Sequence, residues 1–163
     1  RCFWGLQKFF DQFAGVVSTE VGYANGPDHR DSHSPTYEEV CRSSGHAETV
    51  KIIYDEKEIS LSELLRFYFM VIDPVSVNRQ GNDRGIQYRT GIYYTDADDL
   101  PAIMEVYDEV SKGYDVPLAV EVGPLRNFYP AEDYHQGYLE NNPDGYCHLP
   151  WELFEFARQA KDE

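Results

Sequence analysis

The apolar residues of this chain change their spacing several times between helical periodicity and strict alternation. The first such segment has the i, i+3, i+4, i+7 spacing of an amphipathic helix at Leu6, Phe9, Phe10 and Phe13. We expect this helix to end before Gly15. Residues 17–23 then alternate apolar and polar positions, as a half-buried strand does. A chain that uses both periods in short segments must pack helices and strands into the same core.

The same kinds of signal continue to the end of the chain. Ser60 and Glu63 form a capping-box pattern at the start of one helix, and Asp73-Pro74 follows its end. We expect further helices at 37–41, 60–70, 96–112, 131–140 and 151–160, strands at 48–55, 88–95 and 118–122, and polar loops at 25–35 and 78–87. Strands and helices mix without regular alternation, so the predicted fold class is α+β rather than doubly wound α/β.

Length and charge bound the kinds of protein this chain can be. Its 163 residues contain no repeat or linker, so we expect one domain over 1–163. The 14 Lys and Arg residues are outnumbered by 29 Asp and Glu, which gives a net charge of −15. A negatively charged surface repels nucleic acid and anionic membranes, so we expect neither as a partner. No uncharged apolar run approaches the roughly 18 residues of a membrane span. We expect a cytoplasmic protein, with a removed leader left open because the chain starts at Arg1.

Cys2 is the first candidate for chemistry. The three cysteines, Cys2, Cys41 and Cys147, are too few and too scattered for a disulfide scaffold. Cys2 stands just before a predicted helix, where the helix dipole lowers the pKa of a thiol, and two large aromatic residues follow it. Such a thiolate could attack a small apolar substrate that carries an electrophilic atom. Position alone nevertheless favours a buried structural cysteine.

Two polar clusters are further candidates. Residues 35–48 place a tyrosine, a histidine and three glutamates around the start of a predicted strand. Glu48 shares a strand face with Val50 and Ile52, so burial could raise its pKa and make it a general acid, although spacing alone favours a solvent-exposed glutamate. Residues 78–89 are polar around Gly81 and Gly85 and could converge on a pocket, or form a solvated loop.

A metal site is the weaker interpretation of the remaining donors. The potential ligands are His29, His33, Cys41 and His46, and none of them shows the close pairing of a structural zinc site. Surface histidines are the favoured interpretation. The acidic run 96–99 fits a helix N-terminus better than a calcium loop, because the twelve-residue pattern is missing.

Six short strings occur in the order seen in the peptide methionine sulfoxide reductase A family. They are Cys2-Phe-Trp-Gly5, Pro35-Thr-Tyr-Glu-Glu-Val40, Gly45-His-Ala-Glu48, Arg79-Gln-Gly-Asn-Asp83, Gln87-Tyr-Arg89 and Phe128-Tyr-Pro-Ala-Glu-Asp-Tyr-His-Gln136. Each string alone is weak evidence, but six in register are specific. The chain therefore resembles this family over essentially all of residues 1–147, with 148–163 as a C-terminal helical extension.

The resemblance implies a fold, a reaction and a set of site residues. The implied fold is a two-layer sandwich, a ferredoxin-like α/β roll with a mixed or antiparallel sheet. The implied reaction is the reduction of methionine-S-sulfoxide, free or in proteins, as repair of oxidative damage. The family's nucleophile matches Cys2 and its proton donor matches Glu48. The residues that hold the sulfoxide oxygen match Tyr37, Tyr88 and Asp83, and the walls that receive the S-methyl group match Phe3 and Trp4.

The resemblance also implies how the enzyme is regenerated. Attack leaves Cys2 as a sulfenic acid, which condenses with a second thiol. Cys147 matches the family's resolving cysteine, and thioredoxin or another dithiol would reduce the Cys2–Cys147 disulfide. No metal and no organic cofactor is implied, and Cys41 is expected to be structural.

Some positions depart from the family's pattern. The strand that normally precedes Cys2 is absent from this sequence, which puts stability in doubt, and Gln7 replaces a usual glutamate, as a packing or surface change. The extension could cover the core or lead into a fused R-epimer reductase. Two alternatives from other classes remain: another thiol enzyme, such as a peroxidase or dithiol oxidoreductase, or a non-catalytic module that binds methionine.

Overall fold

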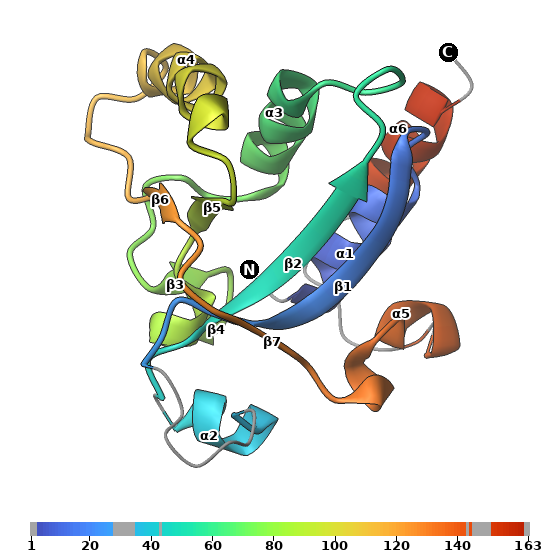
Figure 1. Ribbon diagram of the computed structural model, residues 1–163, viewed down its shortest axis with the longest axis vertical. Helices are drawn as coiled ribbons and strands as arrows, with labels where there is room; N and C mark the ends of the chain where they lie inside the picture. The colour runs from blue at the N-terminus through green and yellow to red at the C-terminus, as the bar shows by residue number, and fades with distance from the viewer. Residues whose placement is uncertain (1–2, 28–34, 43, 143, 145–150, 162–163) are drawn as a thin grey trace.

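A three-stranded antiparallel sheet forms the centre of the molecule. The computed structural model describes residues 3–27, 35–42, 44–142, 144 and 151–161. Strand β1 (Val16–Ala24) lies in the middle of this sheet, between β2 (Ala47–Tyr54) and β7 (Phe128–Pro130). The register places Tyr23 opposite Glu48 on one side and opposite Tyr129 on the other. Figure 1 shows β1 and β2 as a long twisted ribbon with β7 across one end.

Helix α1 (Phe3–Asp11) packs along the β1–β2 ribbon. Its buried face carries Leu6, Phe9 and Phe10, which belong to the main hydrophobic core. The predicted helical spacing at 6–13 is therefore confirmed as a core-facing stripe. Helix α6 (Trp151–Lys161) contacts the same helix and adds Phe154 and Ala157 to this core.

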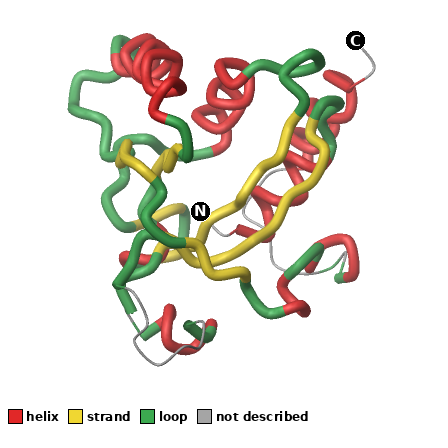
Figure 2. The backbone as a smooth tube through the Cα atoms, in the orientation of Figure 1, coloured by secondary structure: helices red, strands yellow, loops and turns green. Residues whose placement is uncertain are grey.

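A second group of elements stands beside the ribbon (Figures 1 and 2). Strands β5 (Gly91–Tyr94) and β6 (Glu121–Pro124) form a parallel pair, and helices α3 (Leu61–Val71) and α4 (Leu100–Ser111) pack on each other nearby. Between α3 and β5 the chain forms the short hairpin β3 (Arg79–Gln80) and β4 (Asp83–Arg84), followed by the one-turn helix η1 (Ile86–Tyr88). Antiparallel and parallel pairing thus occur together with segregated helices, and the fold class is α+β.

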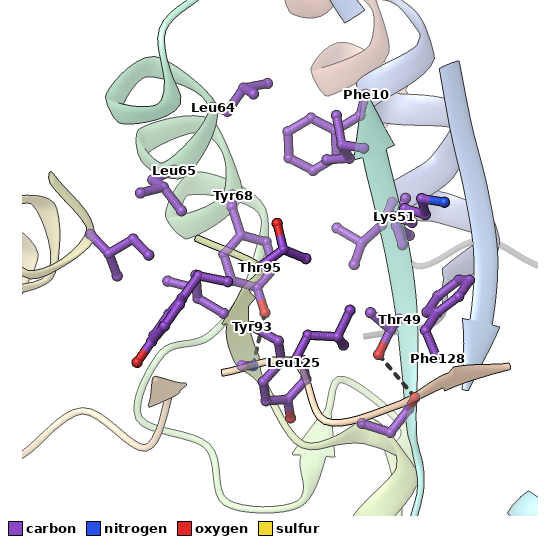
Figure 3. A pocket seen from close by; sticks show the side chains of 18 of the residues that line it. Phe10, Thr49, Lys51, Leu64, Leu65, Tyr68, Tyr93, Thr95, Leu125 and Phe128 are labelled. Atoms are coloured by element: carbon purple, nitrogen blue, oxygen red, sulfur yellow. Dashed lines mark hydrogen bonds between the residues drawn. The ribbon is translucent and has the colours of Figure 1, made fainter. Parts of the chain in front are cut away.

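A cavity of about 270 Å³ separates β2 from β5. Figure 3 shows Thr49 and Lys51 on the β2 side, Tyr93 on the β5 side, and Leu65 and Tyr68 from α3. The described residues form separate sheets on the two sides, because neither β2 nor β5 pairs with another described strand across this cavity.

The remaining elements are short and carry the polar segments of the chain. They are α2 (Tyr37–Cys41), η2 (Ala97–Asp99), η3 (Asp133–His135) and α5 (Tyr138–Asn141). The sequence predictions need four corrections. The strand expected at 88–95 begins only at Gly91, because Tyr88 ends η1, and the strand expected at 118–122 begins only at Glu121. The loop expected at 78–87 contains β3 and β4, and strand β7 was missed.

Candidate active site

Glu48 lies on β2 where the first turn of α1 covers the strand. Its side chain is 8% exposed, and the backbone N–H of Phe3 donates a hydrogen bond to its carboxyl group. Burial raises the pKa of Glu48 to about 8, and the negative charge of Asp83 acts in the same direction, against the hydrogen bond from Phe3. The solvent-exposed position favoured by spacing alone is therefore wrong. At neutral pH this carboxyl group is protonated, which is the state that a general acid needs.

Tyr37, Tyr88 and Asp83 come from three different elements; Asp83 and Tyr88 interact electrostatically with Glu48, and Tyr37 does so with Tyr88. Burial raises the pKa of Tyr88, and Glu48, Tyr37 and Asp83 raise it further. Tyr88 therefore stays protonated and can donate a hydrogen bond to an acceptor oxygen. The structure thus brings together all four of the polar residues that the resemblance singled out within the described part of the chain.

Local features explain how Tyr37 is placed. It is the first residue of α2, whose N-cap Thr36 accepts a hydrogen bond from the Glu39 N–H, while the Glu39 carboxylate accepts one from the Thr36 N–H. This reciprocal capping box stabilises a helix of only five residues. The Tyr37 N–H donates to Glu132 over 2.8 Å, which ties α2 to the segment that follows β7.

The segment that carries Asp83 and Tyr88 is fixed from both ends. Gln80 is buried, and its amide accepts from the Asp73 N–H and donates to the Asp73 carbonyl at the end of α3. Gly85 has φ +140°, and a side chain there would collide with the Gln87 amide, so glycine is required at this turn.

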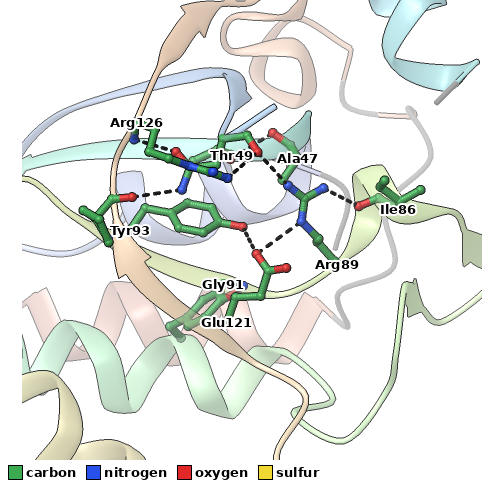
Figure 4. Close-up of polar contacts among 11 residues, drawn as sticks. Ala47, Thr49, Ile86, Arg89, Gly91, Tyr93, Glu121 and Arg126 are labelled. Atoms are coloured by element: carbon green, nitrogen blue, oxygen red, sulfur yellow. Dashed lines mark hydrogen bonds and ion pairs between the residues drawn. The ribbon is translucent and has the colours of Figure 1, made fainter. Parts of the chain in front are cut away.

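Arg89 anchors the other end of that segment (Figure 4). Its guanidinium donates to the carbonyls of Ile86 and Asn25 over 2.9 and 3.2 Å, and it pairs with Glu121 of β6 at 3.2 Å. The Tyr93 hydroxyl donates to the same Glu121 carboxylate over 2.8 Å. These contacts hold η1, and with it Tyr88, against β6.

Phe3 and Trp4 form an aromatic wall at the start of α1. Phe3 is fully buried, with its ring centroid 5.9 Å from that of Tyr23. Trp4 is half-buried and stacks on Tyr138 at 3.9 Å. An apolar, polarisable surface of this kind suits a methyl group attached to sulfur.

Sequence reasoning assigned no role to two further residues of this region, Glu132 and His135. Glu132 accepts hydrogen bonds from the Tyr37 N–H and the Tyr23 hydroxyl, and His135 accepts one from the Trp4 indole. Burial acts to raise the pKa of Glu132, but these hydrogen bonds, one from its own backbone and the charge of His135 lower it overall. Both residues lie in the string 128–136, which carries the family resemblance but no local pattern that predicts these hydrogen bonds.

The structure describes only some of the cysteines and histidines that the sequence singles out. Cys2, Cys147, His29 and His33 lie outside the described residues. Cys41 is an exposed free thiol at the end of α2, hydrogen-bonded to Tyr37, and partial desolvation raises its pKa. Within the described ranges, no group of three or more acidic, histidine or cysteine side chains could hold a metal ion. None of the helices described here has the length and apolar character needed to cross a membrane.

Comparison with known proteins decides the family. The family model described as peptide methionine sulfoxide reductase matches residues 1–163. This chain belongs to that family. The reductase is 55% identical over 160 residues to peptide methionine sulfoxide reductase MsrA of Lachnoclostridium phytofermentans, covering 98% of this chain and 94% of the relative. It is 52% identical over 155 residues to the MsrA of Clostridium acetobutylicum, covering 94% and 93%.

Solved structures agree with this assignment. Mxr1 from Saccharomyces cerevisiae in reduced form matches with a TM-score of 0.85 and 36% identity, over 90% of this chain and 83% of that one. Methionine sulfoxide reductase A of Corynebacterium diphtheriae matches with a TM-score of 0.78 and 34% identity, over 90% and 74%. The chain is thus an oxidoreductase of the methionine sulfoxide reductase type, with the fold of that family.

Proposed function

We propose that this reductase acts on methionine-S-sulfoxide with Cys2 as nucleophile and Glu48 as proton donor. The observation that carries the proposal is the buried Glu48 carboxyl group, protonated at neutral pH and in electrostatic range of Tyr88, which in turn interacts with Tyr37. A sulfoxide oxygen carries partial negative charge and cannot leave sulfur without protonation. A neutral carboxyl group and a protonated phenol supply the hydrogen bonds and the proton at that oxygen.

The proposed reaction transfers one oxygen atom from the substrate to the enzyme. The Cys2 thiolate attacks the sulfoxide sulfur while Glu48 protonates the oxygen, methionine leaves as the thioether, and Cys2 becomes a sulfenic acid. The Cys147 thiol then condenses with that sulfenic acid, forming a disulfide and releasing water. These two steps oxidise the two thiol groups to one disulfide per turnover. They need neither a metal nor an organic cofactor.

Thioredoxin or a similar dithiol is the proposed reductant of the Cys2–Cys147 disulfide. Support comes from the crystal structure of Saccharomyces cerevisiae Mxr1 in complex with Trx2. That structure matches 84% of this chain with a TM-score of 0.56 and 25% identity. The proposed substrates include oxidised methionine in proteins, which fits a role in repair.

The first test compares the S and R epimers of a dabsylated methionine sulfoxide, with dithiothreitol as reductant. We expect turnover of the S epimer alone, complete loss in Cys2→Ser, and retention in the matched control Cys41→Ser. Turnover by Cys2→Ser, or equal turnover of both epimers, would contradict the proposal.

The role of Cys147 needs a separate measurement with thioredoxin in place of dithiothreitol. We expect Cys147→Ser to release about one methionine per chain and then stop, because its sulfenic acid cannot be converted to a disulfide. Sustained thioredoxin-dependent turnover by this variant would show that another group resolves the sulfenic acid.

A further inference from the structure

His135 lies at the centre of the aromatic cluster that contains the proposed substrate pocket. Its side chain is 2% exposed, and its ring centroid lies 5.5 Å from that of Phe3, 5.6 Å from Trp4 and 4.7 Å from Tyr37. These are three of the residues to which the family resemblance assigns substrate binding. A buried imidazole in contact with all three can set their geometry without itself touching the substrate.

One hydrogen bond connects this histidine directly to the pocket wall. The indole Nε1–H of Trp4 donates to Nδ1 of His135 over 3.0 Å. Because an indole N–H is a donor only, Nδ1 must accept, and the proton of the neutral imidazole is on Nε2. Stacking of Trp4 on Tyr138 restrains the plane of the indole ring, and the hydrogen bond fixes its rotation within that plane.

The charge of Glu132 favours the required tautomer of the imidazole. Nε2 of His135 lies 3.6 Å from Oε2 of Glu132, so the carboxylate favours the proton on that nitrogen. The carboxylate is itself fixed, since it accepts hydrogen bonds from the Tyr23 hydroxyl and the Tyr37 N–H, both over 2.8 Å. Glu132 is thus hydrogen-bonded to β1 and α2, and its charge faces a buried Nε2 that has no hydrogen-bond partner among the described residues, while Nδ1 of the same ring binds Trp4.

We infer that His135 is a positioning residue that orients the Trp4 indole for binding the S-methyl group of the substrate, and that protonation of His135 ends this control. The inference rests on the proposed function and on the resemblance, which places Trp4 in the wall that receives the S-methyl group. An imidazolium has donors on both nitrogens and no acceptor, so it cannot receive the indole N–H. Trp4 then loses its partner, and the substrate loses a preorganised surface.

The surroundings of His135 determine where this loss occurs. The ionisable groups that face it are Glu132 and Tyr134 on its own segment, Tyr37 of α2, and Tyr23 of β1 through the shared carboxylate. Burial lowers the pKa of His135 below its usual value of 6.5, although the charge of Glu132 acts in the opposite direction. The acceptor is therefore present at neutral pH and is lost on acidification.

The test compares two substitutions that differ in hydrogen bonding. His135→Asn keeps an acceptor near the Nδ1 position and cannot be protonated, whereas His135→Leu removes the acceptor. With dithiothreitol as reductant, we expect His135→Leu to raise KM for the S-sulfoxide about tenfold at neutral pH with little change in kcat. His135→Asn should keep the KM of the unchanged enzyme at neutral pH and hold it on acidification, where KM of the unchanged enzyme rises.

A double substitution separates positioning from packing. Trp4→Phe has no indole N–H, so in that background His135→Leu should add no further increase in KM. A KM for His135→Asn as high as that of His135→Leu would overturn the inference. So would an effect of His135→Leu that persists at full size in the Trp4→Phe background.

A second measurement keeps this inference distinct from the proposed function. The chain contains two tryptophans, so Trp151→Phe leaves Trp4 as the sole indole fluorophore. We expect its emission to titrate on acidification with His135 present and to stay constant in His135→Asn. A titration that depends on His135 together with no sulfoxide turnover would contradict the proposed function while supporting the connection between Trp4 and His135. An emission that titrates equally in both proteins would overturn that connection.

Discussion

Glu48 is the residue whose protonation should set the alkaline limit of activity. Its pKa of about 8 means that the carboxyl group keeps its proton at neutral pH and loses it as pH rises through that value. We therefore expect kcat for S-sulfoxide reduction to fall above about pH 8. Glu48→Gln should lower kcat at least about 100-fold at neutral pH and remove this limb of the profile. A Gln variant with nearly full activity would exclude Glu48 as the proton donor.

The same group should make stability depend on pH. The pKa of Glu48 is raised from 4.5 to about 8, so the native protein keeps a proton that the unfolded chain releases above 4.5. Its contribution is thus fully present below about pH 4.5 and is lost as pH rises towards 8, by an amount on the order of 5 kcal/mol.

Urea unfolding of Glu48→Gln measures this contribution. We expect the variant to be more stable than the unchanged protein at pH 8 and to show a weaker decline in stability between about pH 5 and pH 8. Glu105→Gln, at an exposed position of α4, is the matched control and should leave the decline unchanged. An identical decline in the Glu48 variant would show that its carboxyl group is not the one that titrates.

Single residues also show where sequence reasoning stops. Glu48 is buried because the first turn of α1 covers it, and alternation along its own strand carries no information about that helix. Gln7 was expected to be a packing or surface change. It is 5% exposed, its Oε1 accepts from the Gly137 N–H, and its Nε2 donates to the Thr19 carbonyl. Both positions depend on contacts between segments that are distant in sequence.

At the scale of elements, two N-caps offer a matched comparison. Thr36 caps α2, which begins with Tyr37, and Ser60 caps α3, which carries no proposed site residue. Thr36→Ala and Ser60→Ala should each lower the free energy of unfolding by about 1 kcal/mol. Only Thr36→Ala should also lower kcat/KM, by up to about fivefold, because 1.4 kcal/mol corresponds to a factor of ten. Equal activity of both variants would show that the order of α2 does not affect the site.

Elements with strong local signals were predicted well. The helices at 61–71 and 100–111 and the strands at 16–24 and 47–54 have a clear period or cap, and the structure contains all four. The hairpin β3–β4 and strand β7 are only two or three residues long, and their pairing depends on partners elsewhere. Gln136 illustrates this, since its side-chain amide bonds both the N–H and the carbonyl of Val21. No local sequence pattern predicts such a contact.

For the molecule as a whole, local periods predicted the fold class, whereas the mixed or antiparallel sheet flanked by helices was predicted by the family resemblance and is confirmed by the solved structures. Mixed local periods are sufficient to indicate α+β. The separation of the described strands into the β2–β1–β7 sheet and the β5–β6 pair, with a cavity of about 270 Å³ between them, depends on long-range packing that local periods do not encode.

Contacts of the C-terminal helix α6 indicate that the extension and the rest of the chain fold as one unit. Phe154 of α6 is 6% exposed within the main core and lies under Lys8 of α1, whose Nζ is 4.8 Å from the ring centroid. Arg158 adds a bond from its Nε to Oε1 of Gln12 over 3.1 Å. These contacts join α6 to α1, and α1 carries Phe3 and Trp4 at its other end. Loss of the α6 contacts should therefore destabilise the core as a whole.

We expect Phe154→Ala to lower the free energy of unfolding by about 3 to 4 kcal/mol, as large-to-small core substitutions do. The matched control is Phe156→Ala, whose side chain is 40% exposed on the same helix and should cost less than about 1.5 kcal/mol. Urea unfolding followed by circular dichroism and by tryptophan emission should give coincident midpoints in the unchanged protein. A separate early transition, with activity retained after it, would show instead that α6 folds independently of the catalytic core.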